Sequence, residues 1–366
     1  MSALELALQR NKYKHLSDEE WHWFLQQVEG RERTADKLPT FVTINDWWYP
    51  VRLSCEQCSS ELTARYKASL VSGDKMVDLT AGYGVDTYFL SEQFKHSEYV
   101  EQNAELCRIA AHNFADKPIT IHNKTAEQFL QTAGQYDLIF LDPARRDSHG
   151  GKVFRLEDCT PNVVELLPEL LQHGKQILLK LSPMLDISQA IKELSAVNWD
   201  IYIVAVKNEV KEVLLLSGGS EKITVIDLTE PEKAFLFTKE EEHASQMRKC
   251  ENEVIGKYLY EPNAAILKAG AYKLVAKRFN LQKLDVNTHL YASDTLVENF
   301  PGRVWEIKSK IEHQKSKIEQ ANVVCRNYPL TPEQLKKKLH LRDGGTAFVI
   351  GCRVVGKPTL FYAERV

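Results

Sequence analysis

Apolar runs of strand length recur along residues 75–228, and segments with helical periodicity separate most of them. Because the strands are apolar on both faces, this alternation predicts a parallel sheet with helices on both sides. The last strands follow one another too closely for a helical crossover, so they should run antiparallel to a neighbour. The expected strands are residues 76–79, 98–100, 119–122, 136–141, 176–181, 200–206, 212–216 and 223–227, with helices near 86–94, 103–115, 125–132, 160–172 and 187–194.

The segments on either side of this pattern differ from it. The first 70 residues are helical in pattern, with a capping box at Ser17 and Glu20 and a second helix over residues 59–70. After residue 230 the pattern predicts a small α+β region. Its expected helices are residues 239–253, 263–269, 305–320 and 331–339, and its expected strands lie near 289–291 and over 346–355 and 358–363, the last two joined by a turn at Gly356-Lys357.

The composition is that of an ordinary globular protein. A chain of 366 residues suggests two or three domains, and no apolar run approaches the roughly 20 residues that span a bilayer. The N-terminus lacks the pattern of a signal peptide, so a cytoplasmic location is expected. The seven cysteines are too scattered for a disulfide framework. Cys55 and Cys58 form a Cys-x-x-Cys pair, which is either half of a zinc or redox motif or two small apolar residues near a helix start.

Charge is distributed unevenly along the chain. Residues 268–366 contain 18 lysines and arginines and 9 acidic residues, whereas the whole chain has a net charge of −3. The C-terminal part is therefore strongly basic and the rest is acidic. This asymmetry suggests either a polyanionic partner for the C-terminal part or a basic surface that only faces solvent.

The strongest chemical signal is a strand that leads into a glycine turn and then a helix, Val77-Asp78-Leu79-Thr80-Ala81-Gly82-Tyr83-Gly84-Val85-Asp86. Gly82 and Gly84 allow the backbone to approach a ligand closely, and Asp78 suits a ligand ammonium group. A dinucleotide fingerprint needs a third glycine and a helix start free for pyrophosphate. Because Asp86 occupies that start and would repel a diphosphate, a nicotinamide cofactor is disfavoured.

Two further carboxylates stand at strand ends. Glu101 ends the second strand, where it can accept both hydroxyls of a ribose or cap the next helix. Asp142 precedes Pro143 at the end of the strand over 136–141, either as a site residue or as a turn former. Since ligands of open α/β sheets bind beyond the carboxyl ends of the strands, Asp78, Glu101 and Asp142 should share one pocket.

These motifs resemble those of class I S-adenosylmethionine-dependent methyltransferases. Five βα repeats and a terminal hairpin are similar to their Rossmann-like seven-stranded sheet, Asp78–Gly84 to their first motif, Glu101 to their ribose-binding acid and Asp142-Pro143 to their fourth motif. The resemblance covers residues 75–228 and implies S-adenosylmethionine as cofactor. The cofactor contacts it implies are Asp78, Thr80, Ala81, Gly82, Gly84, Asp86, Glu101, Asp142 and, around the adenine, the segment Lys124-Thr125-Ala126 with Thr125 and Ala126.

A second resemblance concerns the whole chain. The run Ser59–Tyr66 and the first motif resemble those of RNA guanine methyltransferases, and the chain is similar to a bacterial family that joins this core to a ferredoxin-like module and a THUMP-like domain. It implies a helical N-terminal cap (1–70), a methyltransferase domain (71–230), a linker helix with the ferredoxin-like α+β module (231–325) and the THUMP-like domain (326–366). THUMP domains bind tRNA in their families, in keeping with the basic C-terminal part and its Lys336-Lys337-Lys338.

The residues near Asp142 narrow the reaction. Methylation at carbon 5 of a pyrimidine needs a cysteine nucleophile, and neither Asp142-Pro143-Ala144 nor Leu181-Ser182-Pro183 supplies one. Transfer to a base nitrogen of tRNA or rRNA, with Asp142 and Pro143 in the catalytic position, is therefore the leading hypothesis. Ala144 and Arg145 replace the proline and the stacking aromatic of many amino methyltransferases, so base stacking must come from elsewhere or the target is not a flipped base.

Three arginines are candidates for contacts with the substrate. Arg145 and Arg146 suit phosphate groups or pair with nearby acids, and Arg65 belongs to the run shared with RNA guanine methyltransferases. His149 is an acid/base candidate or a loop residue. The alternatives to RNA methylation are a protein or small-molecule methyltransferase and a non-catalytic RNA-binding protein that retains the fold. No metal site is evident in the sequence.

Overall fold

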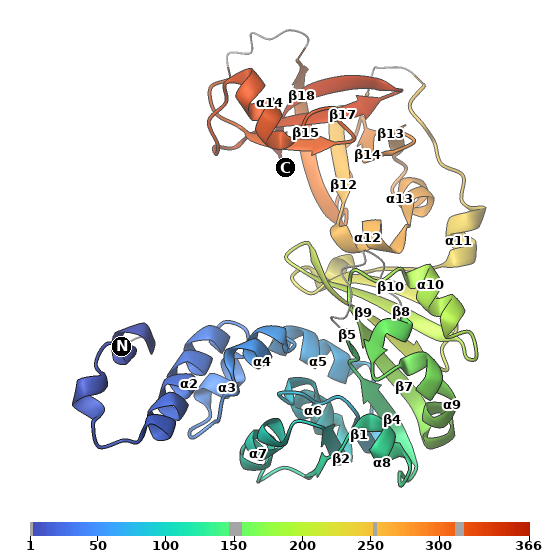
Figure 1. Cartoon of the computed structure of the whole chain (residues 1–366). Coiled ribbons are helices and arrows are strands. Elements are labelled where there is room, and N and C mark those ends of the chain that lie inside the picture. Colours follow the sequence, from blue (N-terminus) through green and yellow to red (C-terminus); the bar gives the residue numbers. More distant parts are fainter. Residues whose placement is uncertain (1–2, 146–155, 252–254, 312–317) are drawn as a thin grey trace. The chain divides into compact units, whose positions relative to one another are not determined.

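The computed structural model describes residues 3–145, 156–251, 255–311 and 318–366 (Figure 1). The chain divides into two compact units. The N-terminal unit consists of residues 1–200 and 213–220, and the C-terminal unit of residues 201–212 and 221–366.

The N-terminal unit begins with a run of helices, drawn in blue in Figure 1. A capping box between Ser17 and Glu20 starts the longest of them, as the sequence predicted. The helices pack on the sheet domain through Phe41, whose ring stacks on Phe89 at 5.9 Å, and through Trp47, which donates a 2.8 Å hydrogen bond to the Tyr83 hydroxyl. The helices are α1 (Ala3–Ala7), α2 (Asp18–Thr34), α3 (Pro39–Thr43), α4 (Arg52–Gln57) and α5 (Glu61–Ser69), with a 3-10 turn at Arg10–Tyr13.

A nine-stranded mixed sheet follows, with strand order β11-β10-β8-β9-β7-β4-β1-β2-β3. Strands β7, β4, β1, β2 and β3 run parallel, and β9 is antiparallel to β7. The strands are β1 (Gly73–Asp78), β2 (Phe94–Glu101), β3 (Ile119–Asn123), β4 (Tyr136–Leu141), β7 (Gly174–Leu181), β8 (Trp199–Val206), β9 (Glu209–Ser217), β10 (Lys222–Asp227) and β11 (Phe235–Thr238).

The predicted α/β fold is confirmed, but the sheet has nine strands and not seven. The expected terminal hairpin is β8 and β9, joined at Lys207 and Asn208, which both have positive φ. Strand β10 then pairs parallel with β8, and β11 pairs antiparallel with β10, so the sheet continues beyond the hairpin. Phe235 and Phe237 of β11 are buried, which explains why this segment pairs with the sheet and does not form part of a linker.

Helices lie between the parallel strands at the predicted places. They are α6 (Val85–Leu90), α7 (Ala104–Asn113), α8 (Ala126–Leu130), α9 (Val163–His173) and α10 (Ile187–Glu193), with 3-10 turns at Ser91–Gln93 and Leu156–Asp158. A two-residue ladder pairs β5 (Ala144–Arg145) with β6 (Cys159–Thr160) just after β4. The carboxyl ends of β1, β2 and β4 therefore stand next to one another in the sheet.

The C-terminal unit contains a second, seven-stranded sheet, in the order β13-β14-β12-β15-β18-β17-β16. Its core includes Leu259, Trp305, Ile350 and Ala363, all fully buried. The strands are β12 (Tyr258–Pro262), β13 (Gln282–Asp285), β14 (Thr288–Ser293), β15 (Gly302–Lys310), β16 (Asn322–Arg326), β17 (Ala347–Val354) and β18 (Lys357–Arg365). The helices of this unit are α11 (Lys239–Ala244), α12 (Ala264–Ala269), α13 (Tyr272–Arg278) and α14 (Pro332–Leu339), with a 3-10 turn at Pro231–Lys233.

Two helices predicted in this unit are not formed as expected. The segment after Gly302, predicted as a helix over 305–320, forms strand β15 between β12 and β18. The acidic helix expected over 239–253 ends at Ala244, and Ser245 continues in extended conformation. In β15 the apolar Trp305 and Ile307 alternate with charged residues, so the hydrophobic pattern has the period of two that is typical of a strand. The charged residues alone resemble the exposed face of a helix, which is why a helix was expected.

The hairpin near the C-terminus forms with its turn shifted by one residue. Val354 pairs with Lys357, which makes Val355 and Gly356 the turn residues, with φ of 48° and 79°. The prediction had placed the turn at Gly356-Lys357. Both turn positions thus need a left-handed backbone, which glycine adopts easily and valine adopts at a cost.

Candidate active site

A cavity of about 290 Å³ opens in the N-terminal unit at the carboxyl ends of β1, β2 and β4. The glycine loop, the end of β2, the start of α8 and the segment after β4 line it. The helical cap contributes Ser54, Gln57, Cys58 and Ser59. Of the predicted site residues, the cavity lining includes Asp78, Thr80, Ala81, Gly82, Gly84, Asp86, Glu101, Thr125, Ala126 and Asp142. The predicted strand-end residues therefore do share one pocket.

The glycine loop is held close to the neighbouring strand. Gly84 has φ of +84° and begins α6, and a Cβ there would lie 2.7 Å from the Phe114 ring. The Tyr99 hydroxyl donates a 2.5 Å hydrogen bond to the carbonyl of Gly82. Only glycine fits at position 84, so the loop passes closer to β2 and α7 than a chain with a side chain there could.

Asp78 is buried at the floor of the cavity, 1 % exposed. Its carboxylate accepts hydrogen bonds from the Thr80 amide at 3.0 Å and the Thr87 hydroxyl at 2.7 Å. Burial raises the pKa of Asp78 to about 8, and the nearby carboxylates of Asp86 and Asp142 add to the increase. A cationic group bound in the cavity would favour the ionised form of this residue.

Glu101 lies across the loop from Asp78. Its carboxylate accepts hydrogen bonds from the amides of Gly82 at 3.0 Å and Asn103 at 2.8 Å. The side chain that caps α7 is that of Asn103, so Glu101 does not serve as the helix cap that was one interpretation of this position. Thr125 caps α8 through a capping box with Gln128 and presents the start of that helix to the cavity.

Asp142 stands just beyond β4, with a side chain 38 % exposed. Its backbone amide donates a 2.6 Å hydrogen bond to the Thr80 hydroxyl, and its carboxylate forms an ion pair with Lys180 of β7. Burial holds the pKa of Asp142 above its usual value, although the ammonium of Lys180 lowers it in part. Ala144 also lines the cavity, and Pro143 connects these two residues.

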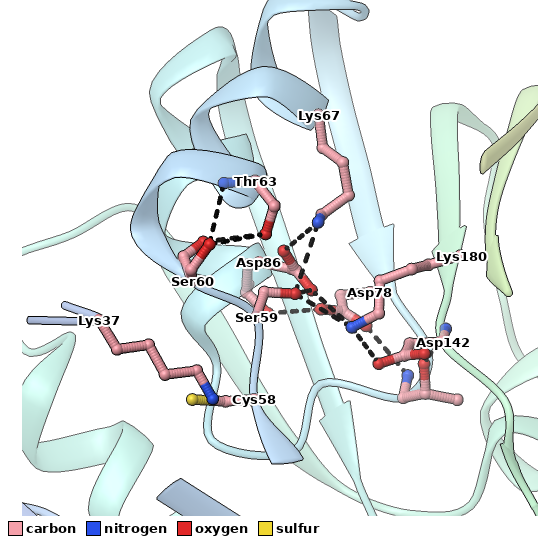
Figure 2. Close-up of polar contacts among 12 residues, drawn as sticks. Lys37, Cys58, Ser59, Ser60, Thr63, Lys67, Asp78, Asp86, Asp142 and Lys180 are labelled. Carbon is pink, nitrogen blue, oxygen red and sulfur yellow. Dashed lines mark hydrogen bonds and ion pairs between the residues drawn. The ribbon is translucent and has the colours of Figure 1, made fainter. Parts of the chain in front are cut away.

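Figure 2 shows a cluster of charged side chains that borders the cavity. Asp86 accepts a 2.7 Å hydrogen bond from Ser59 and lies 3.2 Å from the ammonium of Lys67 and 3.4 Å from that of Lys180. Burial raises the pKa of Asp86, but the two lysines outweigh it, so the pKa lies below its usual value. The charge of Asp86 is thus compensated within the protein. Two lysines therefore offset the negative charge that is expected to repel a diphosphate at this helix start.

Sequence reasoning did not identify Ser59, Lys67 and Lys180 as members of the site. Lys67 is fully buried and the Lys180 side chain is 12 % exposed. One signal was available, because Lys180 interrupts the apolar run Ile177–Leu181 of a buried strand. A lysine in such a strand is seldom buried without a charged partner.

Of the three predicted arginines, the structure describes the side chain of Arg65 alone. Arg65 of α5 is not among the residues that line the cavity, and it contacts Glu61 at 2.8 Å and the Phe89 ring at 4.4 Å. The backbone of Arg145 pairs with Cys159 in the ladder of β5 and β6. Arg146 and His149 lie outside the described residues.

The cysteine pair sits beside the cavity. Cys58 lines it, whereas Cys55 is buried behind it, and both thiols are free. Burial raises the pKa of Cys55 to about 12 and also raises that of Cys58. Both thiols therefore remain protonated at neutral pH. A protonated thiol is a poor metal ligand and a poor nucleophile. Among the described residues, no group of three His, Cys, Asp or Glu side chains is placed to hold a metal ion.

An α/β sheet with a glycine loop after β1, an acid at the end of β2 and a cavity at the strand ends defines a protein of the class I methyltransferase type. Comparison with known proteins supports this class. Residues 258–301 match a family described as a ferredoxin-like domain, and residues 298–365 match one described as THUMP domain-like.

Relatives match nearly the whole chain. A crystal structure described as a putative methyltransferase from Porphyromonas gingivalis is 33 % identical in sequence, with a TM-score of 0.87, and the match covers 96 % of this chain and 92 % of that one. Proteins from two strains of Mycobacterium tuberculosis, both named as uncharacterized S-adenosylmethionine-dependent methyltransferases, are 22 % identical over 91 % of this chain and 92 % of theirs. The chain belongs to this family of S-adenosylmethionine-dependent methyltransferases with ferredoxin-like and THUMP-like domains. In the part of the chain that the structure describes, no helix has the length and apolar character needed to span a membrane.

Proposed function

We propose that the protein transfers the methyl group of S-adenosylmethionine to a base nitrogen of RNA, either tRNA or rRNA. The observation that carries this proposal is the cavity, which the glycine loop, Glu101 and Asp142 all line, and we place the acceptor beside Asp142. The cofactor supplies a methyl group on a positively charged sulfur. The remaining requirements, alignment of the acceptor and removal of its proton, fall to the protein.

The residues of the cavity fit the cofactor. Asp78 is buried and lines the cavity, where a carboxylate suits the ammonium of the methionine part. Glycine at position 84 lets the loop pack closely against Phe114, and the loop then lines the cavity with Gly82 and Gly84. Glu101 would bind the ribose hydroxyls, and the start of α8 at Thr125 and Ala126 would border the adenine.

Asp142 is the proposed proton acceptor on the substrate side. Asp142 lines the cavity, and its carboxylate, when ionised beside Lys180, can accept the departing proton. Pro143 fixes the backbone that follows it. Arg145 and Arg146 come next in the chain and would contact phosphate groups of the RNA, whereas Arg65 would reach RNA only by giving up its contacts with Glu61 and Phe89.

The C-terminal unit supports RNA as the substrate. The THUMP-like match covers β15 to β18, and residues 268–366 carry twice as many basic as acidic residues. Lys337 and Lys338 are exposed on α14, where they are available for phosphate contacts. A basic surface binds RNA through the phosphates of the RNA backbone and not through its bases. We therefore expect this surface to position the substrate and the cavity to select the base.

Methyl transfer to RNA is tested directly with radiolabelled S-adenosylmethionine and total RNA from a strain that lacks the protein. Label in tRNA or rRNA is expected for the wild type, and Asp142→Asn should reduce its rate by about 10²-fold or more, as loss of a general base does. Label in protein or in small molecules would contradict RNA as the substrate. Binding of S-adenosylhomocysteine and RNA without any transfer would support the non-catalytic alternative.

RNA binding by α14 has its own test. The double variant Lys337→Glu, Lys338→Glu should weaken tRNA binding, and the slope of log affinity against log salt should decrease by about 0.9 for each lost phosphate contact. The matched control, Lys95→Glu with Lys192→Glu, changes two exposed lysines of the N-terminal unit by the same charge. Equal effects of the two variants would show that only net charge matters and would remove α14 from the proposal.

A further inference from the structure

Lys180 connects three segments of the N-terminal unit at the edge of the cavity (Figure 2). Its ammonium lies 3.0 Å from the hydroxyl of Ser59, 3.4 Å from the carboxylate of Asp86 and in ion-pair contact with the carboxylate of Asp142. These partners come from the segment before α5, from α6 and from the end of β4. Lys180 is therefore the link between the buried charge cluster and the acceptor side of the cavity.

The largely buried position of Lys180 is energetically unfavourable unless its charge has a function. Its side chain is only 12 % exposed, and the residues on either side of it in β7 are apolar. Burying an ammonium costs desolvation free energy that an apolar side chain of similar size would not cost. Lys67 already supplies Asp86 with a positive charge at 3.2 Å. The partner that depends on Lys180 for its closest positive charge is Asp142.

The charges around Asp142 explain what Lys180 does there. Asp86 on α6 and Asp78 at the end of β1 disfavour a further negative charge, whereas Lys180 on β7 and Lys67 on α5 favour it. Burial also acts against ionisation. Lys180 is in direct contact and Lys67 acts from beyond Asp86, so removal of Lys180 would leave burial and the two carboxylates to favour the protonated form.

We infer that Lys180 is a positioning residue that keeps Asp142 ionised and fixes its carboxylate toward the acceptor. Ser59 and Asp86 hold the ammonium in place, and Lys67 pairs with the same Asp86. The inference rests on the proposed function and adds a residue to it. In the reaction, the acceptor nitrogen uses its lone pair to form the new N–C bond, the electron pair of the broken S–C bond stays on the donor sulfur, and the proton that nitrogen loses passes to Asp142.

This role predicts a specific pH dependence. Only ionised Asp142 can take the proton, so the rate of transfer should rise with pH until this carboxyl is ionised. Without Lys180 the carboxyl ionises at higher pH, and the rising part of the profile should move up by at least about one pH unit, which is about tenfold in rate at any pH below it. A purely structural role for Lys180 would change stability or cofactor affinity but would not move the profile.

The variants Lys180→Met and Lys180→Arg test this with the full-length protein and the RNA assay above. Methionine fills the space without charge and should lower kcat and shift the profile upward, with S-adenosylhomocysteine affinity within about threefold of wild type. Arginine keeps the charge and should retain the wild-type profile. The matched control is Lys175→Met on the same strand, where the lysine is exposed and pairs with Asp137; it should behave as wild type. A wild-type rate and profile for Lys180→Met would overturn the inference.

A second measurement does not need the RNA substrate. In protein labelled with ¹³C at the aspartate carboxyl carbon, the Asp142 signal is identified by its absence in Asp142→Asn, and its titration is followed by NMR. Asp142 should titrate at clearly higher pH in Lys180→Met than in wild type or Lys175→Met. Equal titration in all three would refute the inference even if RNA transfer is observed, whereas absence of transfer by the wild type would refute only the proposed function.

Discussion

Alanine at position 84 should destabilise the N-terminal unit strongly, because two separate costs add there. Gly84 has φ of +84°, a conformation that costs an L-residue with a side chain roughly 1–2 kcal/mol. The new Cβ would also lie 2.7 and 2.9 Å from two ring atoms of Phe114 and 3.2 Å from Tyr99. Both rings are buried, so neither can swing into solvent.

The size of the effect follows from these two terms. Overpacking in a well-packed core costs about 1–3 kcal/mol, so Gly84→Ala should lower the free energy of unfolding by about 2–5 kcal/mol in total. Gly218 is the matched control, because it lies in the same unit with φ of +77° and has no atom within 4 Å of its would-be Cβ. Gly218→Ala should cost only the backbone term, about 1–2 kcal/mol.

Urea unfolding followed by far-UV circular dichroism measures both free energies. The same proteins are titrated with S-adenosylhomocysteine by calorimetry, where Gly84→Ala should bind more weakly, because the loop that lines the cavity must shift away from Phe114. Phe114→Leu in the Gly84→Ala background should recover part of the lost stability, since the clash is with this ring. If Gly84→Ala and Gly218→Ala lose the same free energy, the close approach of the loop to α7 is not what requires glycine.

Three further results are expected. Because burial raises the pKa of Asp78 to about 8, S-adenosylhomocysteine binding should strengthen as pH rises through 8, and Asp78→Asn should abolish this dependence in calorimetry. The same carboxyl binds a proton in the folded protein that the unfolded chain releases near its ordinary pKa of about 4, so the melting temperature of the ligand-free wild type should fall between pH 4 and 8 relative to Asp78→Asn. Lys67→Met leaves buried Asp86 with one cation fewer and should cost about 3 kcal/mol by urea unfolding, whereas exposed Lys175→Met should change little; equal losses would rule out the buried pair as the cause.

The candidate site was largely readable from the sequence for a geometric reason. Asp78, Glu101 and Asp142 each end a strand, and the carboxyl ends of adjacent parallel strands lie along one edge of a sheet. Their positions along the chain therefore predict their proximity once the alternation of strands and helices is recognised. Glycine at position 84 could be interpreted in the same way, because the need for glycine at a strand-to-helix turn is local.

The C-terminal unit was less predictable, because its strands are charged. In β15, Glu306 and Lys308 also suit the exposed face of a helix, and the segment becomes a strand through pairing with β12 and β18, which lie 40 or more residues away along the chain. In the same way β11 extends the first sheet by pairing with β10, and its Phe235 and Phe237 are buried. The helix or strand propensity of a local segment carries no information about these distant pairing partners.

The sequence by itself determined the α/β class, the order of the strands that carry the motifs, the glycine loop and the three carboxylates, since each depends on periodicity or on residues adjacent in the chain. The tertiary structure decided which charges face one another. Ser59, Lys67, Asp86 and Lys180 meet only because α5, α6 and β7 pack together, although Lys180 lies 94 positions after Asp86 in the chain. Whether a buried carboxylate is protonated depends on such neighbours and on desolvation, and both exist only in the folded chain.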